Sequence, residues 1–212
     1  MFDSLIAHFD TALRTLAGVA RAARPTPAGH APGGAEADDA ALTPGQRQLA
    51  ARLMRVNHCG EVCAQALYQG QALASRDAQL SGYLQGAARE EQDHLAWSAE
   101  RIHELGGHTS LLNPLWYAGS LALGYAAGRA GDHWNLGFLV ETEQQVGQHL
   151  GRHLARLPEA DQRTRVVISA MQQDELRHAQ TARSLGAAEL PAAVKLGMRL
   201  ASGIMTRSSY WV

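Results

Sequence analysis

The 212-residue chain has few cysteines, few prolines and few aromatic residues, and each shortage excludes a class of protein. Its two cysteines, Cys59 and Cys63, would lie one turn apart on a helix, where a disulfide would join nothing distant. Two thiols are also too few for a structural zinc site, so two small buried side chains are the simpler interpretation. The 7 prolines exclude collagen-like and low-complexity chains. With aromatic residues at only 6%, the composition favours helix over sheet.

Charge is also scarce. Charged residues make up 18% of the chain and the net charge is −1, which argues against a nucleic-acid partner because such proteins carry a basic surface. The first ten residues contain Asp3 and Asp10 but no Lys or Arg, so we expect no secretion signal. Together with the cysteine usage, this favours a reducing compartment. The length predicts one sizeable domain with extensions.

The N-terminal part predicts two such extensions. The sequence predicts an amphipathic helix over residues 1–24, because apolar residues recur there at helical spacing. Residues 25–44 are rich in Pro, Gly and Ala and predict a flexible linker, which leaves residues 45–212 as the main domain. Two interpretations of the amphipathic helix remain open: it lies on a membrane, or it docks on its own domain.

Four long helices are predicted in the main domain. Thr43 and Pro44 have the residue types of a helix N-cap and first turn, and Gly106, Pro158 and Gly186 mark helix ends. The predicted helices cover residues 43–75, 77–105, 132–157 and 159–185. Four helices of this length predict an all-α protein built as an antiparallel four-helix bundle.

Two apolar segments fall outside these helices. Residues 109–128 contain no charged side chain, but Pro114, Gly119 and Gly124 interrupt them. A second segment opens at Pro191 and runs to about residue 206, with Lys195 and other basic residues beside its apolar positions. We interpret both as elements at a membrane surface rather than as transmembrane helices. The alternative is a crossover and an additional C-terminal helix, both packed on the bundle.

The strongest chemical signal is a repeated Glu-x-x-His motif. Glu91 with His94, and Glu175 with His178, each place a carboxylate and an imidazole on one helix face, a pairing that suits iron or manganese. Each motif follows a glutamate near the middle of the preceding helix, Glu61 or Glu143. The two glutamates are 82 residues apart and the two motifs 84 apart, so the chain carries two copies of one helical pair. Antiparallel packing would bring these side chains to one layer, the ligand set of a ferritin-like dinuclear site: Glu61, Glu91, His94, Glu143, Glu175 and His178.

A third Glu-x-x-His pair, Glu100 with His103, is excluded by helical phase. Glu100 lies nine residues after Glu91, which places it about 180° around the helix. Two other carboxylates, Glu90 and Asp174, directly precede the motif glutamates and would each orient the histidine of the opposite helix or remain exposed. Two histidines, at positions 58 and 149, either line the site or are satisfied elsewhere.

The sequence also resembles a known family. The segments RVNHCGE at 55–61, EQDH at 91–94, NPLW at 113–116 and DELRH at 174–178, together with Glu143, are similar to the demethoxyubiquinol hydroxylases of ubiquinone biosynthesis, the Coq7 or clock-1 family, in its bacterial form. The resemblance covers about residues 48–206. The NPLW turn inside an uncharged segment is more specific than the six proposed ligands, which ferritin-like relatives share.

The resemblance implies a ferritin-like di-iron hydroxylase with two iron ions per chain, held by the six residues above, which would also be its catalytic residues. It implies O₂ as co-substrate and a polyprenyl benzoquinol, lacking one ring methoxy group, as substrate. Electrons would come from NADH, a reductase or the quinol itself; because the chain has no Gly-rich dinucleotide fingerprint, NADH would bind without a Rossmann fold. It further implies a peripheral location on the cytoplasmic side of the bacterial inner membrane, partner proteins of ubiquinone biosynthesis and a homo-oligomer.

Two alternatives remain open at this point. The first is an iron oxidase or peroxidase like bacterioferritin or rubrerythrin, which would use the same six ligands but predicts a polar surface or a Cys-rich electron-transfer module. The second is a non-enzymatic lipid-binding protein whose Glu and His residues are structural. A count of bound iron distinguishes the second, and product analysis distinguishes the first.

Overall fold

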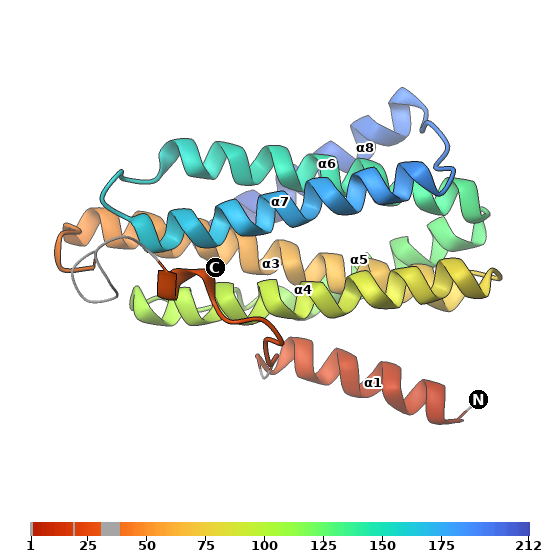
Figure 1. Ribbon diagram of the computed structural model, residues 1–212, viewed down its shortest axis with the longest axis horizontal. Helices are drawn as coiled ribbons and strands as arrows, with labels where there is room; N and C mark the ends of the chain where they lie inside the picture. Colours follow the sequence, from red (N-terminus) through yellow and green to blue (C-terminus); the bar gives the residue numbers. More distant parts are fainter. Residues whose placement is uncertain (1, 19, 31–38) are drawn as a thin grey trace.

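The molecule is built from helices, and its centre is a four-helix bundle (Figure 1). The computed structural model describes residues 2–18, 20–30 and 39–212, and no strand occurs in that part of the chain. The bundle consists of α3 (Pro44–Ala74), α4 (Ala78–Glu104), α6 (Asp132–Arg156) and α7 (Gln162–Ser184). The predicted all-α fold with a ferritin-like arrangement of four long helices is confirmed, and the helix bounds differ from the predicted ones by at most a few residues.

Local sequence explains where the bundle helices begin. Thr43 caps α3: its side chain accepts a hydrogen bond from the Gln46 N–H, and the Gln46 side chain accepts one from the Thr43 N–H at 2.9 Å. The carboxylates of Asp77 and Asp161 cap α4 and α7 in the same way. Gly131 precedes α6 with φ at 109°, a conformation that favours glycine. These caps fix the register of each helix before tertiary packing begins.

Two apolar clusters fill the bundle at different levels along its axis. The Leu53 cluster joins the start of α3 and the end of α4 to the end of α6 and the start of α7, and includes Leu53, Met54, Trp97, Leu150, Ile168 and Met171. The Tyr68 cluster joins the opposite ends of the same helices, and includes Tyr68, Leu80, Leu84, Leu136, Leu139 and Ala182. The middle of all four helices therefore lies between two apolar layers, which supply most of the hydrophobic stabilisation of the bundle.

The N-terminal arm packs against the bundle. Helix α1 (Phe2–Leu16) places Ala12 and Leu16 on a third cluster, formed by Val62, Ala66, Leu95 and Tyr117. Its other side leaves Ile6, Phe9 and Leu13 more than half exposed, so docking on the domain uses only part of its apolar surface. In the segment predicted as a linker, residues 27–30 form the short helix η1 (Pro27–His30), with Ala28 buried in the Leu53 cluster, and residues 31–38 lie outside the described residues.

Helices α5 (Asn113–Arg129) and α8 (Ala192–Trp211) are the two apolar segments outside the bundle. Both pack on α3, on the far side of the bundle in the view of Figure 1. Each leaves a row of large apolar side chains exposed: Leu115, Leu123 and Tyr125 on α5, and Val194, Leu196, Leu200, Ile204 and Trp211 on α8. Among the described residues, no helix combines the length and apolar character needed to cross a membrane.

Helix α5 approaches α3 so closely that two glycines are required. A Cβ atom added to Gly124 would lie 2.3 Å from the backbone oxygen of Leu67, and one added to Gly70 would lie 2.3 Å from that of Leu121. Because backbone atoms form both contacts, no side-chain rotation relieves them. Gly119 lies on the same helix in open space, which makes it a matched control.

We expect Gly124→Ala to lower the free energy of unfolding by about 2 kcal/mol, because the added methyl forces α5 away from α3. Gly119→Ala should instead raise it by about 0.5–1 kcal/mol, the usual gain of alanine over glycine inside a helix. Urea unfolding of the two variants and the unmodified chain measures both changes. Equal stability of the two variants would contradict the close approach of α5 and α3.

Candidate metal centre

The six side chains singled out by the repeated motif meet in one layer at the middle of the bundle. Glu61 comes from α3, Glu91 and His94 from α4, Glu143 from α6, and Glu175 and His178 from α7. None of the six is more than 4% exposed, and three are fully buried. This layer lies between the Leu53 and Tyr68 clusters, so four carboxylates are held in the least solvated part of the protein.

The layer consists of two groups of possible ligand atoms that share two residues. One group contains Glu61 and His94, the other Glu143 and His178, and both contain Glu91 and Glu175. Within each group the ligand atoms lie within 4.8 Å of one another. The sharing gives Glu91 and Glu175 the geometry of bridging carboxylates and leaves Glu61 and Glu143 as terminal ones.

The two histidines point the same ring nitrogen into the layer. His94 Nδ1 lies 3.0 Å from Glu91 Oε2, 3.3 Å from Glu175 Oε1 and 3.6 Å from Glu61 Oε2. On the other side, His178 Nδ1 lies 3.2 Å from Glu91 Oε1 and 3.8 Å from Glu175 Oε2. Each Nδ1 therefore faces carboxylates, and each Nε2 faces outward.

Burial and close negative charges both raise the pKa values of two glutamates, whereas they act in opposite directions on the pKa values of the two histidines. Burial raises the pKa of Glu61 and Glu143 well above the usual glutamate value, and the charges of Glu91 and Glu175 raise both further. Burial lowers the pKa of His178, but the carboxylates of Glu175 and Glu91 outweigh it and raise that pKa to about 10. The pKa of His94 is likewise raised. Without metal ions, the layer therefore holds protons on its histidines and on part of its carboxylates.

The donor set fits two divalent cations. Carboxylate oxygens of all four glutamates are buried without a hydrogen bond among the described residues: both of Glu61 and one each of Glu91, Glu143 and Glu175. Three of these oxygens lie 3.2–3.6 Å from a histidine Nδ1 but form no hydrogen bond with it. Buried polar atoms are rarely left in this state, and each costs free energy unless a ligand satisfies it. Two divalent cations would offset the four negative charges, and mixed oxygen and imidazole ligands suit iron or manganese.

The outward nitrogen of each histidine faces a carboxylate from the opposite helix, which is the first of the two alternatives that the sequence left open for Glu90 and Asp174. His94 Nε2 lies 3.0 Å from Asp174 Oδ2, and His178 Nε2 lies 3.4 Å from Glu90 Oε2. Arg177 joins the two, donating to Asp174 Oδ1 and to Glu90 Oε2 at 2.6 Å each. Burial acts to raise the pKa of Asp174, but hydrogen bonds from His94 and two arginines hold it below its usual value. Asp174 therefore accepts a hydrogen bond from the Nε2–H of His94.

Sequence reasoning missed three residues around the layer. Tyr68 is buried, and its hydroxyl donates to Glu143 Oε1 at 2.6 Å. Its position, seven residues after Glu61 on α3, places it on the same helix face two turns later, a signal that was present in the sequence. Arg24 and Asp93 form a hydrogen-bonded ion pair beside the layer. They are 69 residues apart in the chain, so no local sequence pattern predicts their contact.

The Glu and His residues that the sequence excluded or left undecided lie outside the buried layer. Glu100 and His103 are exposed, in agreement with their exclusion by helical phase. His149 packs its ring on His153, at 3.9 Å between centroids, and His153 Nδ1 lies 2.7 Å from Asn57 Oδ1. Neither His58 nor His149 belongs to the two groups of ligand atoms, so neither lines the site as a ligand. Neither is fully satisfied elsewhere, because His58 Nδ1 and His149 Nε2 are buried without a hydrogen-bond partner among the described residues.

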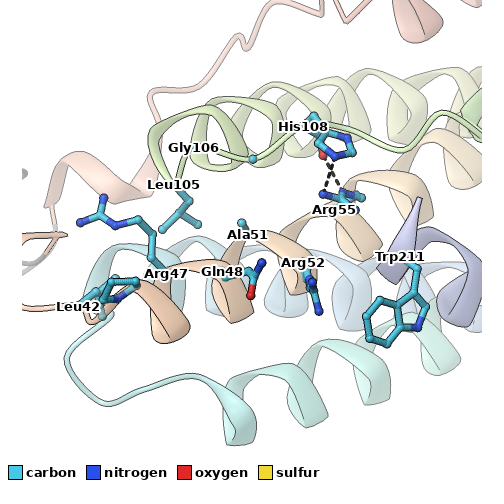
Figure 2. A pocket seen from close by; sticks show the side chains of 12 residues that line it. Leu42, Arg47, Gln48, Ala51, Arg52, Arg55, Leu105, Gly106, His108 and Trp211 are labelled. Atoms are coloured by element: carbon cyan, nitrogen blue, oxygen red, sulfur yellow. Dashed lines mark hydrogen bonds between the residues drawn. The ribbon is translucent and has the colours of Figure 1, made fainter.

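A cavity of about 690 Å³ lies at the end of the bundle where α3 begins (Figure 2). Its lining includes Arg47, Arg52, Arg55 and His108, and none of the described residues that line it carries a carboxylate. Arg55 donates to the carbonyl oxygen of His108 at 2.8 Å, which ties α3 to the loop that leads into α5. The six residues of the buried layer do not line this cavity.

Comparisons with known proteins agree with the geometry. A family model described as "Ubiquinone biosynthesis protein COQ7" matches residues 48–209. Three relatives carry the name 3-demethoxyubiquinol 3-hydroxylase. The protein from Chromobacterium violaceum is 58% identical over 212 residues, covering 100% of both chains. That from Nitrosospira multiformis is 56% identical over 99% of this chain and 98% of the relative. That from Azoarcus sp. is 54% identical over 100% of both.

The buried layer predicts opposite effects of one substitution on fold and on metal binding. Glu143→Gln keeps an oxygen that can accept from Tyr68 and resembles the neutral, protonated side chain that burial favours at this position without metal, so the metal-free protein should unfold at an unchanged or higher temperature. Excess Co²⁺ at about 100 times its dissociation constant should stabilise the unmodified protein by about 2.7 kcal/mol per ion. That gain should be largely lost in the variant.

Thermal unfolding with and without Co²⁺ measures both effects. Glu100→Gln is the matched control, since Glu100 is an exposed glutamate on α4, and it should keep the full metal-dependent gain. A Glu143→Gln variant that keeps the full gain would remove Glu143 from the set of ligands.

Proposed function

The chain belongs to the COQ7 family of ubiquinone biosynthesis proteins, and we propose that it is a 3-demethoxyubiquinol 3-hydroxylase with a di-iron centre in the buried layer. The single observation that carries the site assignment is the pair of overlapping Glu/His groups with buried, unpartnered carboxylate oxygens. The name of the reaction rests on relatives that match along the whole chain.

The proposed reaction replaces a ring C–H bond of a demethoxy polyprenyl benzoquinol with C–OH. One atom of O₂ enters the ring and the other leaves as water, which requires two electrons and two protons from a donor. NADH, a reductase and the quinol itself are the donor classes that fit this balance. Two iron ions, when bound, supply the activation of O₂ that organic side chains cannot provide.

The protein's own residues have separate tasks in this proposal. Glu61 and His94 would hold one ion and Glu143 and His178 the other, while Glu91 and Glu175, which belong to both groups, would contribute to both. The apolar layers on both sides exclude water from the centre. The Tyr68 hydroxyl donates a hydrogen bond to Glu143 Oε1, which restricts the orientation of that carboxylate.

Two alternatives have less support. A bacterioferritin-like or rubrerythrin-like oxidase would use the same ligand set, but the relatives that match over the whole chain carry the hydroxylase name. A purely structural role for the layer would leave the unpartnered carboxylate oxygens unexplained, since structural carboxylates are normally paired or hydrogen-bonded.

We also propose that the protein binds peripherally to the cytoplasmic side of the bacterial inner membrane. A polyprenyl tail is insoluble in water, so the enzyme must take its substrate from a bilayer. The exposed apolar side chains of α5 and α8 support this assignment, because large apolar side chains left in water by two helices that both pack on α3 are suited to a lipid surface. Arg199 and Arg207 are exposed on α8, where they suit anionic headgroups. Partner proteins and a homo-oligomer remain part of this proposal.

The reaction itself is tested with the iron-loaded full-length protein, a demethoxyubiquinol analogue and O₂. The expected product is the hydroxylated quinol, and Glu175→Ala should abolish it, because a bridging ligand is lost, while the helices stay folded. Glu100→Ala, at an exposed glutamate of α4, should turn over normally. Oxidation of iron without hydroxylated product would favour the iron oxidase alternative instead.

Membrane binding is tested with a charge placed on the exposed row of α8. Leu200→Glu, at a side chain that is 62% exposed, should reduce sedimentation with anionic liposomes and turnover of a long-tailed substrate together. Turnover of a short-tailed, water-soluble analogue should survive, because the metal layer is untouched. Leu176→Glu makes the same change at an exposed leucine of α7 and should leave liposome binding intact. Unchanged liposome binding of Leu200→Glu would contradict the proposed membrane surface.

A further inference from the structure

The segment between α1 and η1 crosses α4 and α7 directly outside the buried layer. The backbone N–H of Ala23 donates to Asp93 Oδ1 at 2.6 Å, and Trp97 Nε1–H donates to the carbonyl oxygen of Arg24 at 3.3 Å. Asp93 and Trp97 are both buried residues of α4 and lie on either side of His94 in the sequence. The segment is therefore anchored by its backbone beside one of the two proposed histidine ligands.

The side chain of Arg24 links the two helices that carry the Glu-x-x-His motifs. Its Nε donates to Asp93 Oδ2 on α4 at 2.5 Å, and its Nη2 donates to Asp174 Oδ2 on α7 at 2.8 Å. The guanidinium carbon also lies 4.8 Å from the centre of the Trp97 ring. A planar guanidinium with several fixed donors is suited to such a bridge, because each of its bonds restricts the others.

The oxygen that Arg24 holds is the one that faces His94. Asp174 Oδ2 lies 3.0 Å from His94 Nε2, and the Trp97 ring lies 5.5 Å from the His94 ring. Arg24 thus contacts both neighbours that limit the rotation of this imidazole. His94 Nδ1, at the other end of the ring, points to the carboxylates of the layer.

The second histidine is held less firmly. His178 Nε2 lies 3.4 Å from Glu90, a carboxylate whose side chain is 43% exposed. Glu90 is held by Arg177, whose side chain is 52% exposed. The two halves of the layer repeat the same motif, but only the His94 half has an orienting carboxylate that is both buried and bonded to the N-terminal segment.

We propose that Arg24 is a positioning residue, which acts through Asp174 to fix the His94 ring and so strengthens one of the two metal positions over the other. The proposal rests on the proposed function, because it requires metal ions in the layer. Removing a carboxylate that orients a metal-bound histidine typically weakens metal binding about 10- to 100-fold. Arg24 acts one contact further out, so the expected loss is about tenfold, at one position only.

The test is calorimetric titration of the metal-free full-length protein with Co²⁺. The unmodified chain should bind two ions. Arg24→Ala should weaken one of them about tenfold and leave the other within about twofold, and Arg24→Lys, which keeps the charge but not the two-pronged bridge, should fall in between. Arg21→Ala is the matched control, since Arg21 is an exposed arginine of the same segment, and it should change neither affinity.

Two further measurements separate positioning from a structural role. In the cobalt-loaded protein, the exchangeable Nε2 protons of the two histidines give separate paramagnetically shifted signals, and in Arg24→Ala only the His94 proton should exchange faster with water. Asp174→Ala leaves Arg24 bonded to Asp93, which keeps the segment anchored, and should weaken the same position at least as much as Arg24→Ala does. Adding Arg24→Ala to Asp174→Ala should cause no further loss.

The outcomes are distinct. Unchanged affinities in Arg24→Ala, or equal losses at both positions, would overturn the positioning role while leaving the metal centre in place. A further loss in the double variant would show that Arg24 does not act through Asp174, and would overturn it as well. An unmodified chain that binds no Co²⁺ would overturn the metal centre and, with it, this inference.

Discussion

The repulsion among four buried glutamates is the constraint on which the rest of the structure depends. Carboxylates removed from water and placed within hydrogen-bonding distance of shared histidines are costly, and the raised pKa values of Glu61 and Glu143 express that cost. Apolar clusters above and below the layer hold the four helices together, so the layer itself does not need to. Because the apolar clusters hold the helices together, the bundle can stay folded despite the free-energy cost of its buried carboxylates.

The same division explains why the surroundings of the layer are rigid. Side-chain caps fix the starts of α3, α4 and α7, and two glycines let α5 press its backbone against α3. Carboxylates on the outer side of each histidine then restrict the rings, and arginines restrict the carboxylates. The arginines thus limit the motion of the carboxylates, and the carboxylates limit the rotation of the histidine rings. Such restriction is what precise placement of metal ligands requires.

Much of the layer could be predicted because its information is local. Glu-x-x-His spacing sets a shared helix face, and equal offsets between two copies set a shared level in an antiparallel bundle. Tyr68 follows from the same phase argument applied two turns beyond Glu61. Arg24 could not be predicted, because its contacts with Asp93 and Asp174 join residues 69 and 150 positions apart through an irregular segment. The exposed rows of α5 and α8 fall between these cases: their apolar character is in the sequence, but which side chains stay uncovered depends on how both helices pack on α3.

Helix α3 connects the two chemical requirements of the proposed reaction. One side of it presents Glu61 to the buried layer, and other positions pack against α5 and α8, whose outer surfaces are apolar. A substrate with an insoluble tail and a polar ring needs both environments within its own length. An enzyme that placed them on separate domains would have to extract the whole tail from the bilayer before reaction. This fold instead places both next to one helix, so the packing of α3 against the layer on one side and against α5 and α8 on the other sets the distance between the metal layer and the apolar outer surface.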